Sequence, residues 1–173
     1  CNSVASYQLR NRATIGGNCC NASPAADTAP ALLCLDAVAE IFGPGGARRV
    51  AIGDFFTGPG RTVLQRGEFL SSIHLPPMTG RAGGAYNKLV RTRIGDISLV
   101  SVAVHCHQAG GLPAWRIAIG AAGPIPLRAV EAEAALAQDT STEGIARAAD
   151  LAAAAARPID DIRGSAAYRR AMV

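Results

Sequence analysis

The strongest constraint on the fold is a change of pattern near residue 123, where strand signals stop and helix signals begin. Before it, three apolar, β-branched stretches are typical of strands: AYNKLV, DISLVSVAVHCHQ and AWRIAIGAA, the last two joined by the turn QAGGLP. After it, alanine, leucine and glutamate dominate and predict three helices: AVEAEAALA, STEGIARAADLAAAAA and SAAYRRAMV. Strands followed by helices, rather than alternating with them, indicate an α+β fold.

The first eighty residues carry their own set of signals. Asp27 or Thr28 can cap a helix in which Pro30 lies in the first turn. The stretch AEIFGPGGARRVAI predicts a β-hairpin, and IGDFFTGPGRTVLQRGEFLSSIHLPP predicts a helical turn, a glycine loop and a strand from about Phe69 to Leu75. The polar, glycine-rich MTGRAGG is the best linker between this region and the strands that follow.

Composition excludes several classes of protein. The chain has 173 residues and a net charge of +4, but its basic residues are scattered and not interleaved with aromatics, which argues against nucleic-acid binding. No apolar run is long enough for a membrane span, and a cytoplasmic protein is expected. Five cysteines without a C-x-x-C pair predict buried, reduced thiols and neither a disulfide framework nor a zinc site. The start at Cys1, inside what reads as domain text, predicts a fragment or processed product.

The segment ATIGGNCCNASPAAD is almost free of large side chains. Gly16 and Gly17 permit backbone conformations that are closed to other residues and let a ligand approach the peptide groups. Thr14 adds a hydroxyl donor and Asn18 an amide, so the segment suits a phosphate or pyrophosphate. Asp27 would suit a sugar or ribityl hydroxyl, because a carboxylate accepts hydrogen bonds and repels phosphate.

Local pattern alone favours a simpler interpretation of this segment, a tight turn or β-bulge with Asp27 as a helix cap. The segment fits neither G-x-G-x-x-G nor a P-loop, which needs a lysine after the glycines. His105 and His107 share one strand face, but with no carboxylate at matching spacing they are interpreted as a structural pair rather than metal ligands.

Four stretches together carry a resemblance to a known family: QLRNRATIGGNCCNASPAAD, GEFLSSIHLP, AYNKLVRTRIGDISLVSVAV and PIDDIRGSAAYRR. In this order they resemble the flavin-carrying medium subunit of the molybdenum hydroxylases, of the xanthine dehydrogenase and carbon monoxide dehydrogenase type. The resemblance implies the second half of a PCMH-type FAD-binding α+β domain over residues 1–79. It also implies, over residues 80–173, a C-terminal domain with a three-stranded antiparallel sheet packed on three helices. The resemblance also implies that the family's N-terminal half, with its second glycine-rich loop, is missing from this sequence.

The same resemblance implies a set of FAD contacts. Five residues match the segment around the pyrophosphate, and Asp27 matches the acidic residue that binds FAD hydroxyls. Ile97 matches the position beside the isoalloxazine ring, Lys88 a basic residue near the flavin, and Val4 and Leu70 lining positions. The implied FAD-binding residues are Val4, Thr14, Ile15, Gly16, Gly17, Asn18, Asp27, Leu70, Lys88 and Ile97.

The function that the resemblance implies is electron transfer. FAD on this subunit would receive electrons from [2Fe-2S] clusters on a small iron–sulfur subunit, supplied by a molybdenum cofactor on a large subunit, and pass them to an external acceptor. No catalytic acid or base is expected in this chain, and its cysteines lack the grouping of a four-iron cluster. The alternative is a non-catalytic docking fragment that no longer holds FAD and only contacts partner subunits. A self-standing flavin oxidase ranks last, because no substrate acid or base is evident.

Overall fold

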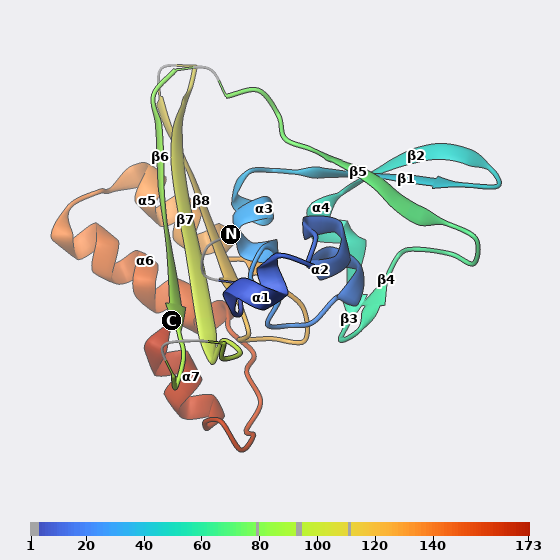
Figure 1. Cartoon of the computed structure of the whole chain (residues 1–173). Helices are drawn as coiled ribbons and strands as arrows, with labels where there is room; N and C mark the ends of the chain where they lie inside the picture. Colours follow the sequence, from blue (N-terminus) through green and yellow to red (C-terminus); the bar gives the residue numbers. More distant parts are fainter. Residues whose placement is uncertain (1–3, 79, 93–94, 111) are drawn as a thin grey trace.

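The protein has a long antiparallel sheet with structure packed on both of its faces. The structure is a computed structural model that describes residues 4–78, 80–92, 95–110 and 112–173. In Figure 1 the long green and yellow strands stand upright, the orange and red C-terminal helices lie on one side, and the blue and cyan N-terminal elements lie on the other. This mixed arrangement confirms the α+β class.

The long sheet has the order β6-β7-β8-β9, with every neighbouring pair antiparallel. Its strands are β6 (Ala82–Leu89), β7 (Val100–Ala109), β8 (Leu112–Gly120) and β9 (Leu127–Arg128). The three predicted strands are confirmed. The predicted strand count was one too low, because β9 has only two residues and exists through its pairing with Ala118 and Ile119 rather than through a local pattern.

One face of the sheet packs on the C-terminal helices. Ile117 and Ile119 of β8 point to this face and share a core with Ala132, Leu136 and Ala148 of the helices. The alternation of side chains along a strand places these residues on one side and their neighbours on the other. The three predicted helices are confirmed as α5 (Val130–Gln138), α6 (Thr142–Ala155) and α7 (Ala166–Met172).

The opposite face of the sheet packs on α3 (Ala29–Cys34), whose N-cap is Thr28. Small residues make this contact close: Ala103 and Ala118 are buried under the helix, and a Cβ at Gly120 would lie 2.9 Å from Pro30 Cγ. Because α3 comes from the N-terminal part of the chain, this packing fixes that part against the long sheet.

The N-terminal part contains a second antiparallel sheet of order β2-β1-β5. The predicted hairpin is confirmed as β1 (Val38–Gly43) and β2 (Gly46–Ala51), and the predicted late strand as β5 (Phe69–His74). Between β2 and β5 lie three short elements: α4 (Ile52–Phe55), β3 (Phe56–Gly58) and β4 (Arg61–Thr62).

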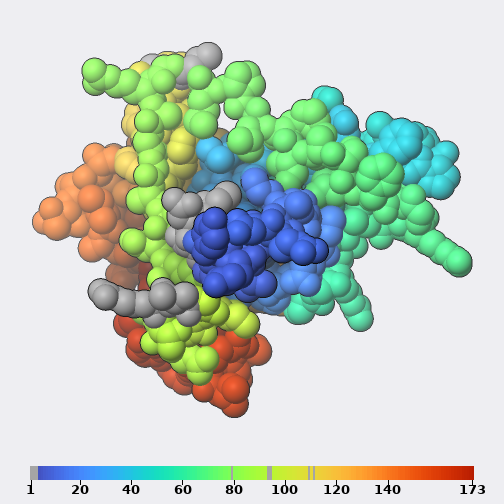
Figure 2. Space-filling view, viewed as in Figure 1, coloured from blue at the N-terminus to red at the C-terminus, as the bar shows by residue number. Residues whose placement is uncertain are grey.

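Two short helices precede these elements, α1 (Tyr7–Arg10) and α2 (Ile15–Asn21). The space-filling view shows this dark blue segment at the centre of one face, between the green strand β6 and the second sheet, β2-β1-β5 (Figure 2). Across the described ranges, no helix combines the length and the apolar character needed to cross a membrane.

Candidate functional site

The glycine segment forms a helix rather than a loop. Thr14 is the N-cap of α2, and its Oγ1 accepts a hydrogen bond of 2.9 Å from the Gly17 amide. Gly16 and Gly17 are the second and third residues of this helix, with helical backbone rather than the positive φ of the left-handed region. The unusual dihedrals that these glycines permit are therefore not adopted, and the simpler prediction of a tight turn or bulge was wrong. The side-chain cap of Thr14 selects the helix despite its glycines.

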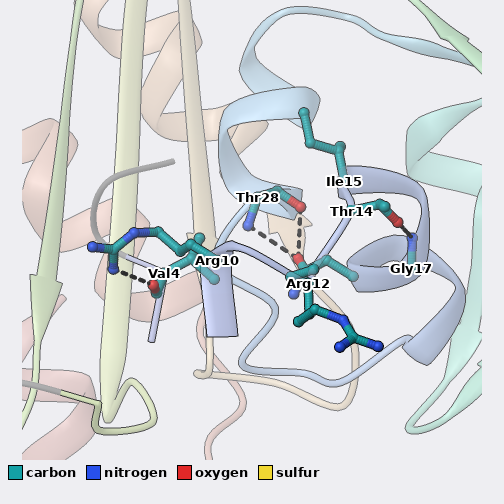
Figure 3. A pocket seen from close by; sticks show the side chains of 9 residues that line it. Val4, Arg10, Arg12, Thr14, Ile15, Gly17 and Thr28 are labelled. Atoms are coloured by element: carbon teal, nitrogen blue, oxygen red, sulfur yellow. Dashed lines mark hydrogen bonds between the residues drawn. The ribbon is translucent and has the colours of Figure 1, made fainter. Parts of the chain in front are cut away.

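The start of α2 borders a cavity of about 490 Å³, shown in Figure 3. Five of the predicted FAD contacts line it together with other residues of the N-terminal segment: Val4, Thr14, Ile15, Gly17 and Asn18, with Arg10, Arg12, Ala13 and Thr28. Of the first amides of α2, that of Gly17 is already bonded to Thr14, whereas those of Ile15 and Gly16 have no acceptor within the helix and carry its positive end. Backbone donors and arginines therefore border one space.

The two arginines of this cavity differ in their bonding. Arg10 turns back on the chain and donates hydrogen bonds of 2.7 Å to the Val4 carbonyl and 3.0 Å to the Ala5 carbonyl. Arg12 is exposed and extends away from Arg10 in Figure 3. Arg10 thus fixes the course of the chain at Val4, whereas Arg12 offers its guanidinium to an anion in the cavity.

Asn18 and Thr28 join α2 to the start of α3. The Oδ1 atom of Asn18 accepts hydrogen bonds from the Thr28 hydroxyl at 2.6 Å and from the Thr28 amide at 3.3 Å. Since Thr28 uses the amide oxygen, the end of Asn18 that remains for a ligand is its NH₂ group, which can only donate. This orientation suits an acceptor such as a phosphate oxygen.

Asp27 lies next to Thr28 and joins the N-terminal part to the long sheet. Its Oδ2 is 2.9 Å from Lys88 Nζ, and its Oδ1 accepts hydrogen bonds from the Ser98 hydroxyl at 3.0 Å and the Tyr86 hydroxyl at 3.3 Å. The Asp27 and Lys88 side chains are only 11% and 10% exposed. Burial, with the nearby Asp27 carboxylate contributing, raises the pKa of Tyr86 to about 12, so its hydroxyl remains a donor at neutral pH. Two of the predicted contacts therefore form one buried ion pair.

The other predicted residues lie at two neighbouring cavities. Gly16 and Leu70, together with Ile15, line a cavity of about 280 Å³ between α2 and β5. Ile97, which is 52% exposed, lines another of about 530 Å³ with Ser98 and Pro24. Ile15 borders the first two cavities, and Ser98 connects the third to Asp27. Eight of the ten predicted residues thus line these three cavities, whereas Asp27 and Lys88 line none of them.

Sequence reasoning missed several residues of this region. Arg10 and Arg12 were not assigned, although two arginines just before the glycines are a readable signal for an anion site. Tyr86 and Ser98 carried no such signal, because each contacts Asp27 only through the packing of the long sheet on the N-terminal part.

Two of the four described thiols, those of Cys19 and Cys34, are buried. Burial raises the pKa of Cys19 to about 11 and of Cys34 to about 12, which keeps both protonated at neutral pH. The prediction of buried thiols was wrong for Cys20, which is exposed on α2, and Cys106 is only half-buried. Cys1 lies outside the described residues.

The two strand histidines stack on each other. The ring centroids of His105 and His107 are 5.4 Å apart, and burial lowers the pKa of His105. In the described part of the chain, no group of three or more His, Cys, Asp and Glu residues could hold a metal ion. The interpretation of these histidines as a structural pair stays a prediction.

Comparison with known proteins gives consistent matches along the chain. Residues 1–78 match the family model described as the FAD binding domain in molybdopterin dehydrogenase, and residues 84–173 match the CO dehydrogenase flavoprotein C-terminal domain. The chain is 41% identical over 133 residues to a xanthine dehydrogenase FAD-binding subunit of Escherichia coli O157:H7, covering 76% of this chain and 46% of that subunit.

Two carbon monoxide dehydrogenases extend the match over nearly the whole chain. The medium chain from Afipia carboxidovorans is 38% identical over 172 residues, covering 98% of this chain and 59% of that one. The structure of the enzyme from Hydrogenophaga pseudoflava has a chain that superimposes with a TM-score of 0.92 at 37% identity, covering 98% of this chain and 60% of that one. The chain thus spans about half to three fifths of the length of these relatives.

Proposed function

Since the chain belongs to the CO dehydrogenase flavoprotein family, we propose that it binds FAD as the flavin-carrying part of a molybdenum-containing hydroxylase or dehydrogenase. In this proposal residues 1–79 are the second half of the FAD-binding domain, and residues 80–173 are the flavoprotein-like C-terminal domain. The protein is then an oxidoreductase subunit. Its cytoplasmic location remains a prediction from sequence.

The observation that carries the proposal is the cavity at the start of α2. It brings together the exposed Arg12 guanidinium, the first helix amides and the donor end of Asn18, within the region that matches an FAD binding domain. These groups are all donors or cations, which is the set that a pyrophosphate needs. The residues present therefore fit the anionic part of FAD.

Asp27 fits the hydroxyl-bearing part of FAD. A carboxylate has about four acceptor positions, and the described donors to Asp27 come from Lys88, Ser98 and Tyr86. One position remains for a hydroxyl of the ligand, while Lys88 Nζ holds Oδ2 in place at 2.9 Å. Asp27 would orient the ligand and close the contact between the two parts of the protein.

When bound, FAD supplies the redox chemistry, and the chain contributes binding, orientation and exclusion of water. Ile97 would cover the flavin ring with an aliphatic side chain, and Leu70 would cover the ligand from β5. Electrons would come from [2Fe-2S] clusters on a small iron–sulfur subunit, fed by the molybdenum cofactor of a large subunit, and leave to an external acceptor. The N-terminal half of the FAD domain would complete the site. The substrate is set by the large subunit, in line with relatives named for substrates as different as xanthine and carbon monoxide.

Native mass spectrometry of the gently purified protein tests the proposal directly. We expect the added mass of FAD together with an N-terminal-half polypeptide and the masses of a large and a small co-purifying subunit. A chain that appears alone and without flavin would overturn the proposal and leave the docking fragment as the remaining function.

A charge variant tests the cavity itself. Arg12→Gln should weaken FAD binding about 10- to 150-fold, because a charge-assisted hydrogen bond contributes about 1.5–3 kcal/mol. The matched control is Arg170→Gln, which removes an equally exposed arginine from α7. Equal FAD affinity of both variants, measured by titration of flavin fluorescence, would remove Arg12 from the site.

A further inference from the structure

Arg169 of α7 is a buried arginine whose side chain donates four hydrogen bonds. It is 4% exposed, and its Nη1 donates to the carbonyls of Leu99 at 2.9 Å and Ala121 at 3.2 Å. Its Nη2 donates to Asp161 Oδ1 at 2.6 Å, and its Nε to the Gly164 carbonyl at 3.5 Å. The guanidinium therefore joins the C-terminal helix to the start of β7 and the end of β8.

The carbonyls of Leu99 and Ala121 lie just outside β7 and β8, in segments that are hydrogen-bonded to residues 24–27. Ser98, which precedes Leu99, donates its hydroxyl to Asp27 Oδ1 at 3.0 Å. The amide of Ala121, whose carbonyl accepts from the guanidinium, donates to the Pro24 carbonyl at 2.8 Å. Arg169 thus bonds to two segments, residues 98–99 and Ala121, which are called the two arms below. Each arm is hydrogen-bonded to one end of residues 24–27.

The geometry of these arms depends on an imposed backbone conformation. Ala121 has a φ of 59°, in the left-handed region that a non-glycine residue adopts only when its surroundings hold it there. It is held on one side by the guanidinium and on the other by Pro24. Only arginine offers a planar fork that can satisfy two carbonyls and a carboxylate together, which lysine cannot do.

The same residue reaches the cavity that contains Ile97. Arg169 and Asp161 line this cavity of about 530 Å³ together with Ile97, Ser98 and Pro24. The cavity wall beside Ile97 is therefore built partly on the C-terminal segment, which lies far from the start of α2 in the sequence.

We propose that Arg169 is a positioning residue of the flavin site, which sets Asp27 and Ile97 for the ligand by holding the carbonyls of Leu99 and Ala121. This inference rests on the proposed function, since it assigns a role in FAD binding. It concerns a residue that acts through others and need not touch FAD.

The test uses the protein purified with its native partners, stripped of flavin and titrated with FAD. Arg169→Met should raise the FAD dissociation constant at least about tenfold, within the range typical of indirect coupling. Arg169→Lys keeps the positive charge beside Asp161 but loses the fork, and should bind FAD no better than Arg169→Met. Ser98→Ala cuts one arm at its end and should weaken binding in the same direction with little cost to folding.

The effects of Arg169→Met and Ser98→Ala on the free energy of FAD binding should not be additive. If Arg169 acts through Ser98, the double variant should bind FAD more tightly than the product of the two single effects predicts. Additive effects would overturn the proposal. If Arg169 variants fail to fold, Ser98→Ala still tests the proposal. Unchanged FAD affinity in this variant would show that the bond from Ser98 to Asp27 does not contribute to FAD binding, and would overturn the proposal.

Two controls separate positioning from general stability. Arg170→Met alters the exposed neighbour of Arg169, and Leu136→Ala destabilises the core on the α5 side of the sheet. Neither should change FAD affinity or hydrogen exchange of residues 22–27 and 96–99. Equal loss of FAD in Leu136→Ala and Arg169→Met would reduce Arg169 to a stability role.

Hydrogen exchange measured without FAD distinguishes failure of the proposed function from failure of the Arg169 inference. If wild-type protein binds no FAD, the proposed function fails. Faster exchange of residues 22–27 and 96–99 in Arg169→Met would then still support the positioning role, and unchanged exchange would overturn it. If wild-type and Arg169→Met proteins bind FAD equally, the proposed function stands and this inference is overturned.

Discussion

Gly16→Ala should make the protein more stable and bind FAD less well. Gly16 is the second residue of α2 and has helical backbone, so the fold itself has no need of glycine there. A Cβ at this position would meet Leu70 Cδ2 at 3.7 Å, an ordinary van der Waals contact. The added methyl group is therefore accommodated without displacement of its neighbours.

The expected size of both effects follows from these contacts. Alanine stabilises a helix over glycine by about 0.5–1 kcal/mol. For a protein of this size that corresponds to a rise in melting temperature of about 1–4 °C. The methyl group also enters the cavity that Gly16 shares with Leu70, so a ligand lying against the backbone would be displaced. Loss of one hydrogen bond to a charged group costs about 1.5–3 kcal/mol, or at least tenfold in affinity.

Thermal unfolding without flavin and a titration with FAD measure the two effects. Gly53→Ala is the matched control, because Gly53 is also the second residue of a helix and its Cβ would meet Leu33 Cδ2 at 3.6 Å, away from the described cavities. It should be stabilised in the same way and bind FAD normally. A lower melting temperature in Gly16→Ala would refute the helical account of the segment, and unchanged FAD affinity would refute the close approach of the ligand.

Two further predictions concern charged pairs. Asp27→Asn removes one partner of a buried ion pair and should lower the free energy of unfolding by about 3 kcal/mol, measured by urea denaturation. Adding Lys88→Met should restore much of this loss, and no recovery would argue against the pair as its source. Hydrogen bonds from Arg48, and then from the Gln65 amide, lower the pKa of Glu68 from 4.5 to about 2. Because the folded pKa is depressed, this stabilisation is complete above pH 4.5 and disappears as the pH falls toward 2. The difference in urea midpoint between wild type and Glu68→Gln should shrink over that range, and a constant difference would contradict the assignment.

Much of the fold follows from local pattern. Alanine-rich stretches after residue 129 form helices because their propensity and spacing act over a few neighbouring residues. The hairpin of β1 and β2 follows from the glycines and Pro44 between two apolar runs. The helix at Ile15 was missed because glycine content argued against it, although the Thr14 cap that selects it is itself a local signal.

The candidate site depends partly on residue types and partly on contacts between distant segments. Sequence by itself determined that Thr14, Asn18 and Asp27 carry groups able to bind a phosphate and a hydroxyl, because donors and acceptors belong to residue types. Only the tertiary structure decided that Asp27 meets Lys88, 61 positions away, and that Arg169 bonds the carbonyls of Leu99 and Ala121. Those contacts depend on how closely α3 packs on the long sheet, and the packing of distant surfaces leaves no periodic trace in either segment.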